Sequence, residues 1–301
     1  MFAPHSTAEH AAGLEARIRE ADIYIPELMG WDNKSLRLFQ QVADGKVDYS
    51  QAMDRSRGWQ GGYGEFREAQ FNALHKSGVR VALIDIPAGH ELEKYEREEM
   101  YQEFAIGDTF DETIANIKEH MQAEAEFTKR REDYMLEQLQ PTVQKVIDAN
   151  PALKQKDKVN VLLSLGSYHT RVYHEVKRSG VESQRTFYDP RTIVSNSSGE
   201  MQRSFAFNKD VSDELAAHVL FESLFLKSLG NNLYDRFGDH ITVSLIARKL
   251  GSQFTVDDMR AIFNDSKGDE VRMAGAVGEA IRERKLTLPT TPAEVATYLS
   301  S

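Results

Sequence analysis

The chain has 301 residues, of which 28% are charged, and its formal net charge is -10 at pH 7. This acidic balance argues against nucleic acid or an anionic membrane as the main partner, because both attract basic surfaces. The absence of cysteine excludes disulfides, thiolate metal sites and a cysteine nucleophile. The chain does not open with a positively charged segment and an apolar core, and no apolar run approaches the roughly 20 residues that span a bilayer. We therefore expect a cytoplasmic protein without a membrane segment.

The first segment predicts a helix and then a short strand. His5 precedes a helix whose apolar stripe contains Leu14 and Ile18. Residues 21 to 25 (ADIYI) read as a short strand, and Glu27 follows it closely. His5 and Glu27 are therefore candidate site residues, although a solvated loop carboxylate is the simpler interpretation of Glu27 taken alone.

Residues 33 to 78 read as helical, with interruptions at Gly45 and at a glycine cluster over residues 58 to 64. The cluster, GWQGGYG, lacks the Lys and Ser/Thr of a phosphate-binding loop, so we interpret it as a flexible connection. Residues 79 to 86 (VRVALIDI) predict a second buried strand. Asp85 lies near its end, just before Pro87, so a carboxylate again falls at the carboxyl end of a strand.

Residues 91 to 150 form the most strongly charged helical stretch of the sequence. Charge runs of this kind are usually solvated helix faces. We expect a long helix near residues 111 to 139, with Pro141 interrupting the pattern. Arg131 and Met135 lie four residues apart and share one face of this helix. Met135 can then pack inward while Arg131 reaches the edge of the sheet.

Residues 159 to 165 (VNVLLSL) predict a strand buried on both faces of a mostly parallel sheet. The strand breaks at Gly166, and a helix is expected from roughly residue 170 to 177, so His169 lies in the turn between them. Ligands of open α/β sheets bind at this carboxyl edge. His169 can change protonation near neutral pH or offer a nitrogen to a metal. A turn histidine bonded to backbone is the simpler alternative.

The remainder of the chain predicts an edge strand and then helices. Residues 181 to 189 are polar and alternating, which is typical of an edge strand. A loop rich in Ser, Asn and Gly at 195 to 199 marks a domain boundary. Helices are expected at 213 to 229, 239 to 250, 255 to 264, 269 to 285 and 291 to 299. Within the first of these, Phe221, Leu224 and Phe225 can either form a partner-binding face or pack among the helices.

The predicted fold class is α/β, with a mostly parallel central sheet flanked by helices and a C-terminal helical region. We assign residues 1 to 195 to the α/β domain and residues 196 to 301 to the helical region. Because the carboxyl ends of parallel strands meet at one edge of a sheet, Glu27, Asp85 and His169 are expected to lie on that edge.

Several features occur in a recognisable order: a histidine before the first helix, Glu27 after a strand, a strand VALIDIP, the R-[DE]-x-x-M sequence at Arg131 to Met135, and GSYH ending at His169. They resemble the superfamily that joins TraB/PrgY/Tiki proteins with erythromycin-esterase and ChaN-like proteins. The resemblance covers roughly residues 1 to 190. This superfamily carries two GxxH motifs. Residues 166 to 169 match the second, whereas Phe2 stands at the glycine of the first.

The resemblance implies a site of His5, Glu27, Arg131 and His169 at the carboxyl edge, with Asp85 as a supporting residue. Tiki-like members are similar to metal-dependent proteases, erythromycin esterases hydrolyse a lactone, and ChaN-like members bind haem. We therefore expect a hydrolase of ester or peptide bonds that acts on a small molecule or a peptide.

A divalent metal ion (Mn, Co or Zn) held by His5, Glu27, His169 and Asp85 would lower the pKa of bound water enough to make a nucleophile. Arg131 would stabilise the developing oxyanion or clamp an acidic substrate through its fork of donors. Without a metal, His5 or His169 would act as general base on water, with Glu27 orienting it.

The alternative is a non-catalytic binding protein, including a haem or small-ligand binder, that kept the fold. The departure at Phe2 favours this second reading. The sequence leaves a homo-oligomer open.

Overall fold

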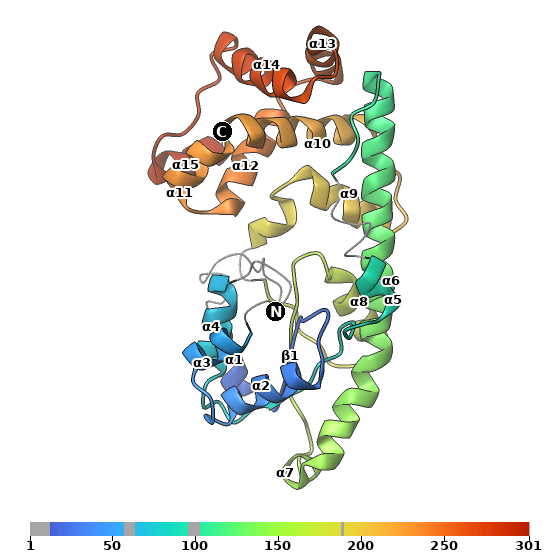
Figure 1. Ribbon diagram of the computed structural model, residues 1–301, viewed down its shortest axis with the longest axis vertical. Helices are drawn as coiled ribbons and strands as arrows, with labels where there is room; N and C mark the ends of the chain where they lie inside the picture. Colours follow the sequence, from blue (N-terminus) through green and yellow to red (C-terminus); the bar gives the residue numbers. More distant parts are fainter. Residues whose placement is uncertain (1–12, 57–63, 96–102, 188–189, 301) are drawn as a thin grey trace. The chain divides into compact units, whose positions relative to one another are not determined.

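The computed structural model describes residues 13–56, 64–95, 103–187 and 190–300 (Figure 1). The chain divides into two compact units. The first comprises Met1–Tyr101 and Phe127–Asp189, and the second comprises Gln102–Glu126 and Pro190–Ser301. The sequence-based division at residue 195 differs from this in two respects, because residues 102–126 belong to the second unit and that unit resumes at residue 190.

The first unit is built on a small, fully parallel sheet. Its strands are β1 (Ile23–Pro26), β2 (Arg80–Val81) and β3 (Val161–Ser164), in the order β2-β1-β3. Ile23 is in register with Arg80 on one side and with Val161 on the other. The expected mixed α/β class with a parallel sheet flanked by helices is confirmed, although the sheet has three strands only among the described residues.

Two expected strands are shorter or absent, because pairing and not hydrophobicity defines a strand. The apolar run 79 to 86 pairs with β1 only at Arg80–Val81. The chain leaves the ladder after the amide of Ala82 donates to the carbonyl oxygen of Tyr24 (3.0 Å), yet Leu83 and Ile84 stay buried in the core. The prediction of an edge strand over residues 181 to 189 is wrong for 181–186, which form no strand, and Phe187 makes only an isolated bridge.

The central strand and the edge strand differ in burial. Every residue of β1 is buried, whereas the first three residues of β3 are half-buried. The prediction that residues 159 to 165 are buried on both faces is therefore wrong, since β3 lies at the edge of the sheet.

Helices cover both faces of the sheet (Figure 1). Tyr24 and Val81 pack into one core with residues of α1 (Leu14–Glu20), α2 (Asn33–Ala43), α3 (Tyr49–Arg55) and α4 (Gly64–Leu74). Ile23 and Ile25 point to the opposite face, because side chains alternate along a strand. There they pack with residues of α6 (Phe110–Ala149), α7 (Pro151–Lys154) and α8 (Thr170–Arg178). Leu92 of the short helix α5 (Glu91–Tyr95) contributes to a small separate cluster.

Helix α6 is longer than its sequence suggested. The expected interruption at Pro141 is wrong, since the helix continues through it to Ala149. Proline removes one helical hydrogen bond and strains the preceding turn. Apolar side chains on both sides of it, including Leu139, Val143 and Val146, pack against the core of the first unit. Their burial offsets the local cost of the proline.

All the regular secondary structure in the described residues of the second unit is helical. Its elements after residue 190 are η3 (Pro190–Val194), α9 (Ser197–Ala206), α10 (Asp213–Phe225), η4 (Leu226–Gly230), α11 (Asn231–Phe237), α12 (His240–Gly251), α13 (Val256–Ser266), α14 (Glu270–Glu283) and α15 (Pro292–Ser300). The predicted C-terminal helices are confirmed. Phe221, Leu224 and Phe225 are fully buried in the core of this unit, so they pack among the helices. None of the described helices is long and apolar enough to cross a membrane.

Candidate functional site

Four of the five predicted site residues meet at the carboxyl edge of the sheet. Glu27 directly follows β1, Asp85 lies in the segment after β2, His169 lies in the turn after β3, and Arg131 comes from α6. The strands are parallel, so their carboxyl ends lie at the same edge. The fifth candidate, His5, lies outside the described residues.

Arg131 joins two of the carboxylates. Its Nε and Nη2 donate to the two carboxylate oxygens of Asp85 at 2.8 and 2.5 Å, a two-pronged pairing that the flat guanidinium favours. Nη2 also donates to Oε1 of Glu27 at 3.0 Å. Met135, one turn further along α6, is fully buried and fixes this face of the helix against the sheet. The predicted division of roles between Arg131 and Met135 is thus confirmed.

Asp85 is almost completely buried, with 1% of its surface exposed. Besides Arg131, its carboxylate accepts hydrogen bonds from the backbone amides of Leu28 (3.1 Å) and Ile86 (2.8 Å). Its carbonyl oxygen accepts one from the indole of Trp31 (2.5 Å). These contacts occupy both carboxylate oxygens, so Asp85 holds Arg131 and the two loops in place rather than facing solvent.

Gly166, the first residue of the GSYH sequence, is needed for a close approach. Its backbone amide donates a short hydrogen bond to Oε2 of Glu27. A Cβ atom at this position would lie 3.1 Å from the same oxygen, which is closer than ordinary contact. A larger residue at 166 would therefore push the Glu27 carboxylate away from the turn that carries His169.

His169 lies between two carboxylates. Its Nε2 is 3.4 Å from Oε1 of Glu27, and its Nδ1 is 3.5 Å from Oε1 of Glu132. Only 5% of the residue is exposed. The interpretation as a turn histidine bonded only to backbone is therefore wrong.

The two carboxylates also decide the protonation state of His169. Burial by itself would lower the pKa of His169, but Glu27 and Glu132 raise this pKa to about 9. The imidazole consequently carries a proton and a positive charge at neutral pH.

Glu132 and Arg171 belong to the same cluster, although neither was predicted to be a site residue. The Oε2 atom of Glu132 accepts from Nε of Arg171 at 2.9 Å, and Arg171 also donates to the carbonyl oxygen of Lys129 (3.0 Å) and to Asp133. Glu132 is 1% exposed. Its burial follows from the face of α6 that carries Leu136 four residues later. That spacing was the available signal.

The described residues alone do not form a metal site. Within the parts of the chain that the structure describes, no group of three or more His, Asp or Glu side chains has the arrangement of metal ligands. The guanidinium of Arg131 occupies the position between Glu27 and Asp85 that a shared cation would need.

No known protein was found that could assign a function to this cluster. Comparisons of the chain with protein-family models, with curated proteins and with solved structures gave no match. The resemblance to the TraB/Tiki and erythromycin-esterase/ChaN superfamily therefore stays a prediction that rests on the sequence. The candidate site is defined by its own contacts: Glu27, Asp85, Arg131, Glu132 and His169 at the carboxyl edge of a parallel sheet.

Proposed function

We propose that this protein is a hydrolase that cleaves ester or peptide bonds at the carboxyl edge of the sheet, with His169 as the proton donor. One observation carries the proposal. A single carboxylate oxygen, Oε1 of Glu27, is faced at once by the guanidinium of Arg131 (3.0 Å) and the imidazole of His169 (3.4 Å). This combination of acid, cation and carboxylate suits acyl transfer.

The charge of each side chain determines its role in the proposed reaction. A histidine with a pKa of about 9 is protonated at neutral pH, so it can give its Nε2 proton to a leaving alcohol or amine. Arg131 can stabilise negative charge that develops on a carbonyl oxygen. Glu27 has the most exposed side chain of the three, at 15%. Water can therefore reach the cluster at Glu27, where it bonds to the substrate's carbonyl carbon while the Glu27 carboxylate takes its proton. Asp85 and Glu132 position Arg131 and His169.

A divalent metal ion, Mn, Co or Zn, stays a prediction for this site. The described ligand set does not fit one by itself, and no step above requires it. His5 is the one remaining candidate ligand from the sequence. Addition and removal of metal therefore belong in the activity test.

The test is hydrolysis of a panel of nitrophenyl esters, lactones and fluorogenic peptides by the full-length protein. The assays are run after EDTA treatment and again with Mn²⁺, Co²⁺ or Zn²⁺. We expect His169→Gln to lower kcat/KM by about 100-fold or more, the usual size of general acid catalysis. His174→Gln is the matched control, because His174 lies on α8 and contacts Tyr173 and Arg185. Equal activity of the wild type and the His169→Gln variant on every substrate would refute the proposal.

The burial of the charged side chains in the cluster favours a second, non-catalytic candidate function. The side chains of Arg131, Asp85 and Glu132 are at most 10% exposed, and most of their polar atoms are hydrogen-bonded within the cluster. This is what a purely structural clamp between α6 and the strand ends requires. A non-catalytic binding protein on the same fold, including one for haem or another small ligand, would need no more. Absorbance during haemin titration tests the haem form of this alternative, with a shifted and saturable Soret band as the positive result.

A further inference from the structure

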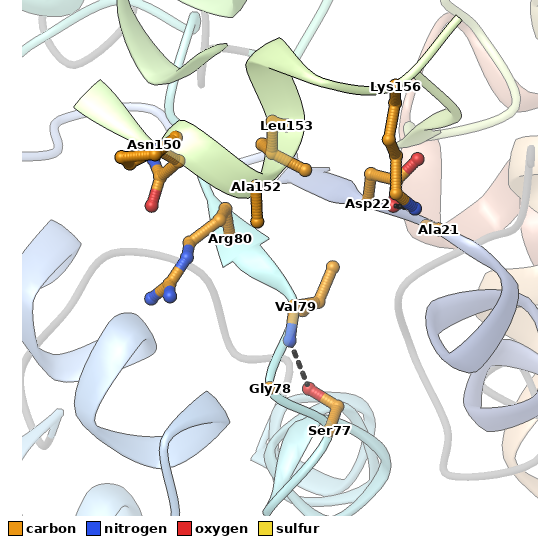
Figure 2. Close-up of a pocket in the computed structure, with 11 residues that line it drawn as sticks. Ala21, Asp22, Ser77, Gly78, Val79, Arg80, Asn150, Ala152, Leu153 and Lys156 are labelled. Carbon is orange, nitrogen blue, oxygen red and sulfur yellow. Dashed lines mark hydrogen bonds and ion pairs between the residues drawn. The ribbon is translucent and has the colours of Figure 1, made fainter. Parts of the chain in front are cut away.

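A cavity of about 350 Å³ lies at the amino edge of the sheet, opposite the cluster of Glu27 and His169. It is lined by the residues that lead into β1 and β2 and by the start of α7 (Figure 2). This volume falls at the lower end of the range of small-molecule sites, which is about 300 to 1,000 Å³. None of the residues of the carboxyl-edge cluster lines this cavity.

The cavity has two differently charged sides. Asp22 and Lys156 pair on one side, with Nζ of Lys156 at 2.5 Å from Oδ1 of Asp22 (Figure 2). The second oxygen of Asp22 accepts from the backbone amide of Asn160 at 2.9 Å. Burial would raise the pKa of Asp22, but the hydrogen bonds from Lys156 and Asn160 lower it overall. The Asp22 carboxylate is therefore ionised and already paired.

Arg80, on the other side of the cavity, is not hydrogen-bonded to a carboxylate of the described residues as Lys156 is. Its nearest carboxylate, that of Asp44, lies 3.7 Å away, which is too far for a hydrogen bond. Asp44 instead accepts from Lys46 (2.8 Å) and Gln40 (2.9 Å). Within the described part of the chain the Arg80 guanidinium donates no hydrogen bond, and its side chain is 44% exposed. The Arg80 guanidinium thus has a long ion pair with Asp44 and no hydrogen-bond acceptor among the described residues, so its donors can still bind a ligand.

The floor between these sides is apolar. Only 4% of the surface of Val79 and 8% of that of Leu153 is exposed. Ala152 lies between Arg80 and the side that carries Asp22 (Figure 2). The amide nitrogen of Asn150 is already bonded to the carbonyl oxygen of Val146 (2.6 Å). The open chemistry of the cavity is therefore one cationic fork next to a small apolar surface.

We propose that this amino-edge cavity binds a small organic carboxylate, whose charged group pairs with Arg80 and whose apolar body lies on Val79 and Leu153. A guanidinium matches the planar carboxylate with two parallel hydrogen bonds. The apolar floor favours an organic acid over inorganic phosphate, which has no apolar part to bury. A cationic ligand is disfavoured, because Asp22 is already neutralised by Lys156.

The experiment uses 4-fluorobenzoate as the probe and the full-length protein. Fluorine NMR line broadening measures binding, and 4-fluorobenzamide is the neutral ligand of the same shape. We expect saturable broadening for the acid and none for the amide. Arg80→Gln should weaken binding of the acid by about tenfold or more, because it removes a charge-assisted pair. Arg80→Lys should retain part of it, and Arg178→Gln should change nothing, since Arg178 is exposed and pairs only with Glu175 in the described structure.

A second readout covers the case in which an Arg80 variant folds poorly. Backbone amide shifts of the wild type on adding 4-fluorobenzoate should concentrate at residues 78–80 and 152–156. Changes that concentrate elsewhere would overturn the proposed site, as would equal binding of the benzamide or full binding to folded Arg80→Gln. Displacement of the probe by inorganic phosphate at equal concentration would overturn the choice of an organic acid as the ligand class.

Discussion

At the scale of single residues, the candidate site is a set of buried charges that neutralise one another. Glu27, Asp85 and Glu132 are balanced by Arg131, Arg171 and His169 within a few ångströms. Moving such charges out of water is costly, and the pairing roughly repays that cost. The network therefore adds little net stability while it is complete. Removal of one member leaves its partners buried and unpaired.

Arg131→Ala is expected to destabilise the protein by about 3 to 5 kcal/mol, the usual penalty for leaving a buried charge without its partner. Asp85 would keep two backbone hydrogen bonds but lose both guanidinium contacts. Urea denaturation followed by circular dichroism measures the change. Arg178→Ala removes an exposed ion pair with Glu175 and should change the free energy of unfolding by less than about 1 kcal/mol. Similar effects of the two substitutions would contradict the buried network.

The pKa of His169 predicts a pH dependence with a definite sign. The folded-state value of about 9 lies above the value of about 6.5 expected in the unfolded chain. The stabilisation is therefore complete below about pH 6.5 and is lost as pH rises through about 9. Urea denaturation of the wild type and His169→Gln from pH 6 to 9.5 should show their difference shrinking toward high pH. A constant difference would mean that His169 does not titrate in this way.

At the scale of elements, α6 decides how the site is assembled. Its residues from Phe127 onward belong to the first unit and carry Arg131, Glu132 and Met135 to the end of the sheet. The turn between β3 and α8 brings His169 to the same place, with Gly166 allowing the contact to Glu27. Neither segment holds the cluster alone, because each supplies only one side of the ion pairs.

We expect Pro141 to lower the stability of α6. Its ring removes a hydrogen bond from the helix interior, and the residue is exposed, so no packing depends on its ring. Pro141→Ala should stabilise the protein by about 1 to 3 kcal/mol, after allowing for the freer unfolded chain. Thermal and urea denaturation measure this change. The neighbouring exposed substitution Gln140→Ala should have an effect of less than about 0.5 kcal/mol. A destabilised Pro141→Ala variant would show that the proline is required.

At the scale of the whole molecule, the two units have separate cores and each contains a buried titratable group. In the second unit, Glu222 of α10 is 4% exposed and accepts from the amide (2.9 Å) and hydroxyl (2.5 Å) of Ser197. Burial raises the pKa of Glu222 to about 7, against the lowering effect of Ser197 and Arg248. Ionisation of this carboxyl at higher pH therefore opposes folding of the second unit.

The second unit should lose stability as pH rises from about 5 to 8. The raised pKa of Glu222 means that its favourable contribution is complete below the unfolded value of about 4.3 and is lost through about 7. Hydrogen exchange of the α10 amides, corrected for the intrinsic pH effect, measures the change. Glu222→Gln should flatten the profile, whereas the exposed Glu214→Gln should leave it unchanged. If the stability of α10 in the Glu222→Gln variant fell with pH as steeply as in the wild type, Glu222 would not be the group responsible.

Local patterns in the sequence were sufficient for much of this organisation. The spacing of apolar residues predicted α8 and the C-terminal helices. Parallel strands ending in Glu27 and His169 predicted a shared edge, because that outcome depends only on strand direction. The i and i+4 spacing was also enough to assign Arg131 and Met135 to their positions.

Only the tertiary structure decided which neighbours those residues have. The apolar run 79 to 86 forms a two-residue strand, and α6 passes through Pro141, because pairing partners and burial on distant segments outweigh local preference. The proton on His169 likewise depends on Glu27 and on Glu132, and Glu132, 37 positions earlier in the chain, had no predicted role. Charge state is a property of the assembled surroundings. The sequence specified where the chemistry could gather, and the packing of α6 against the sheet determined its electrostatic character.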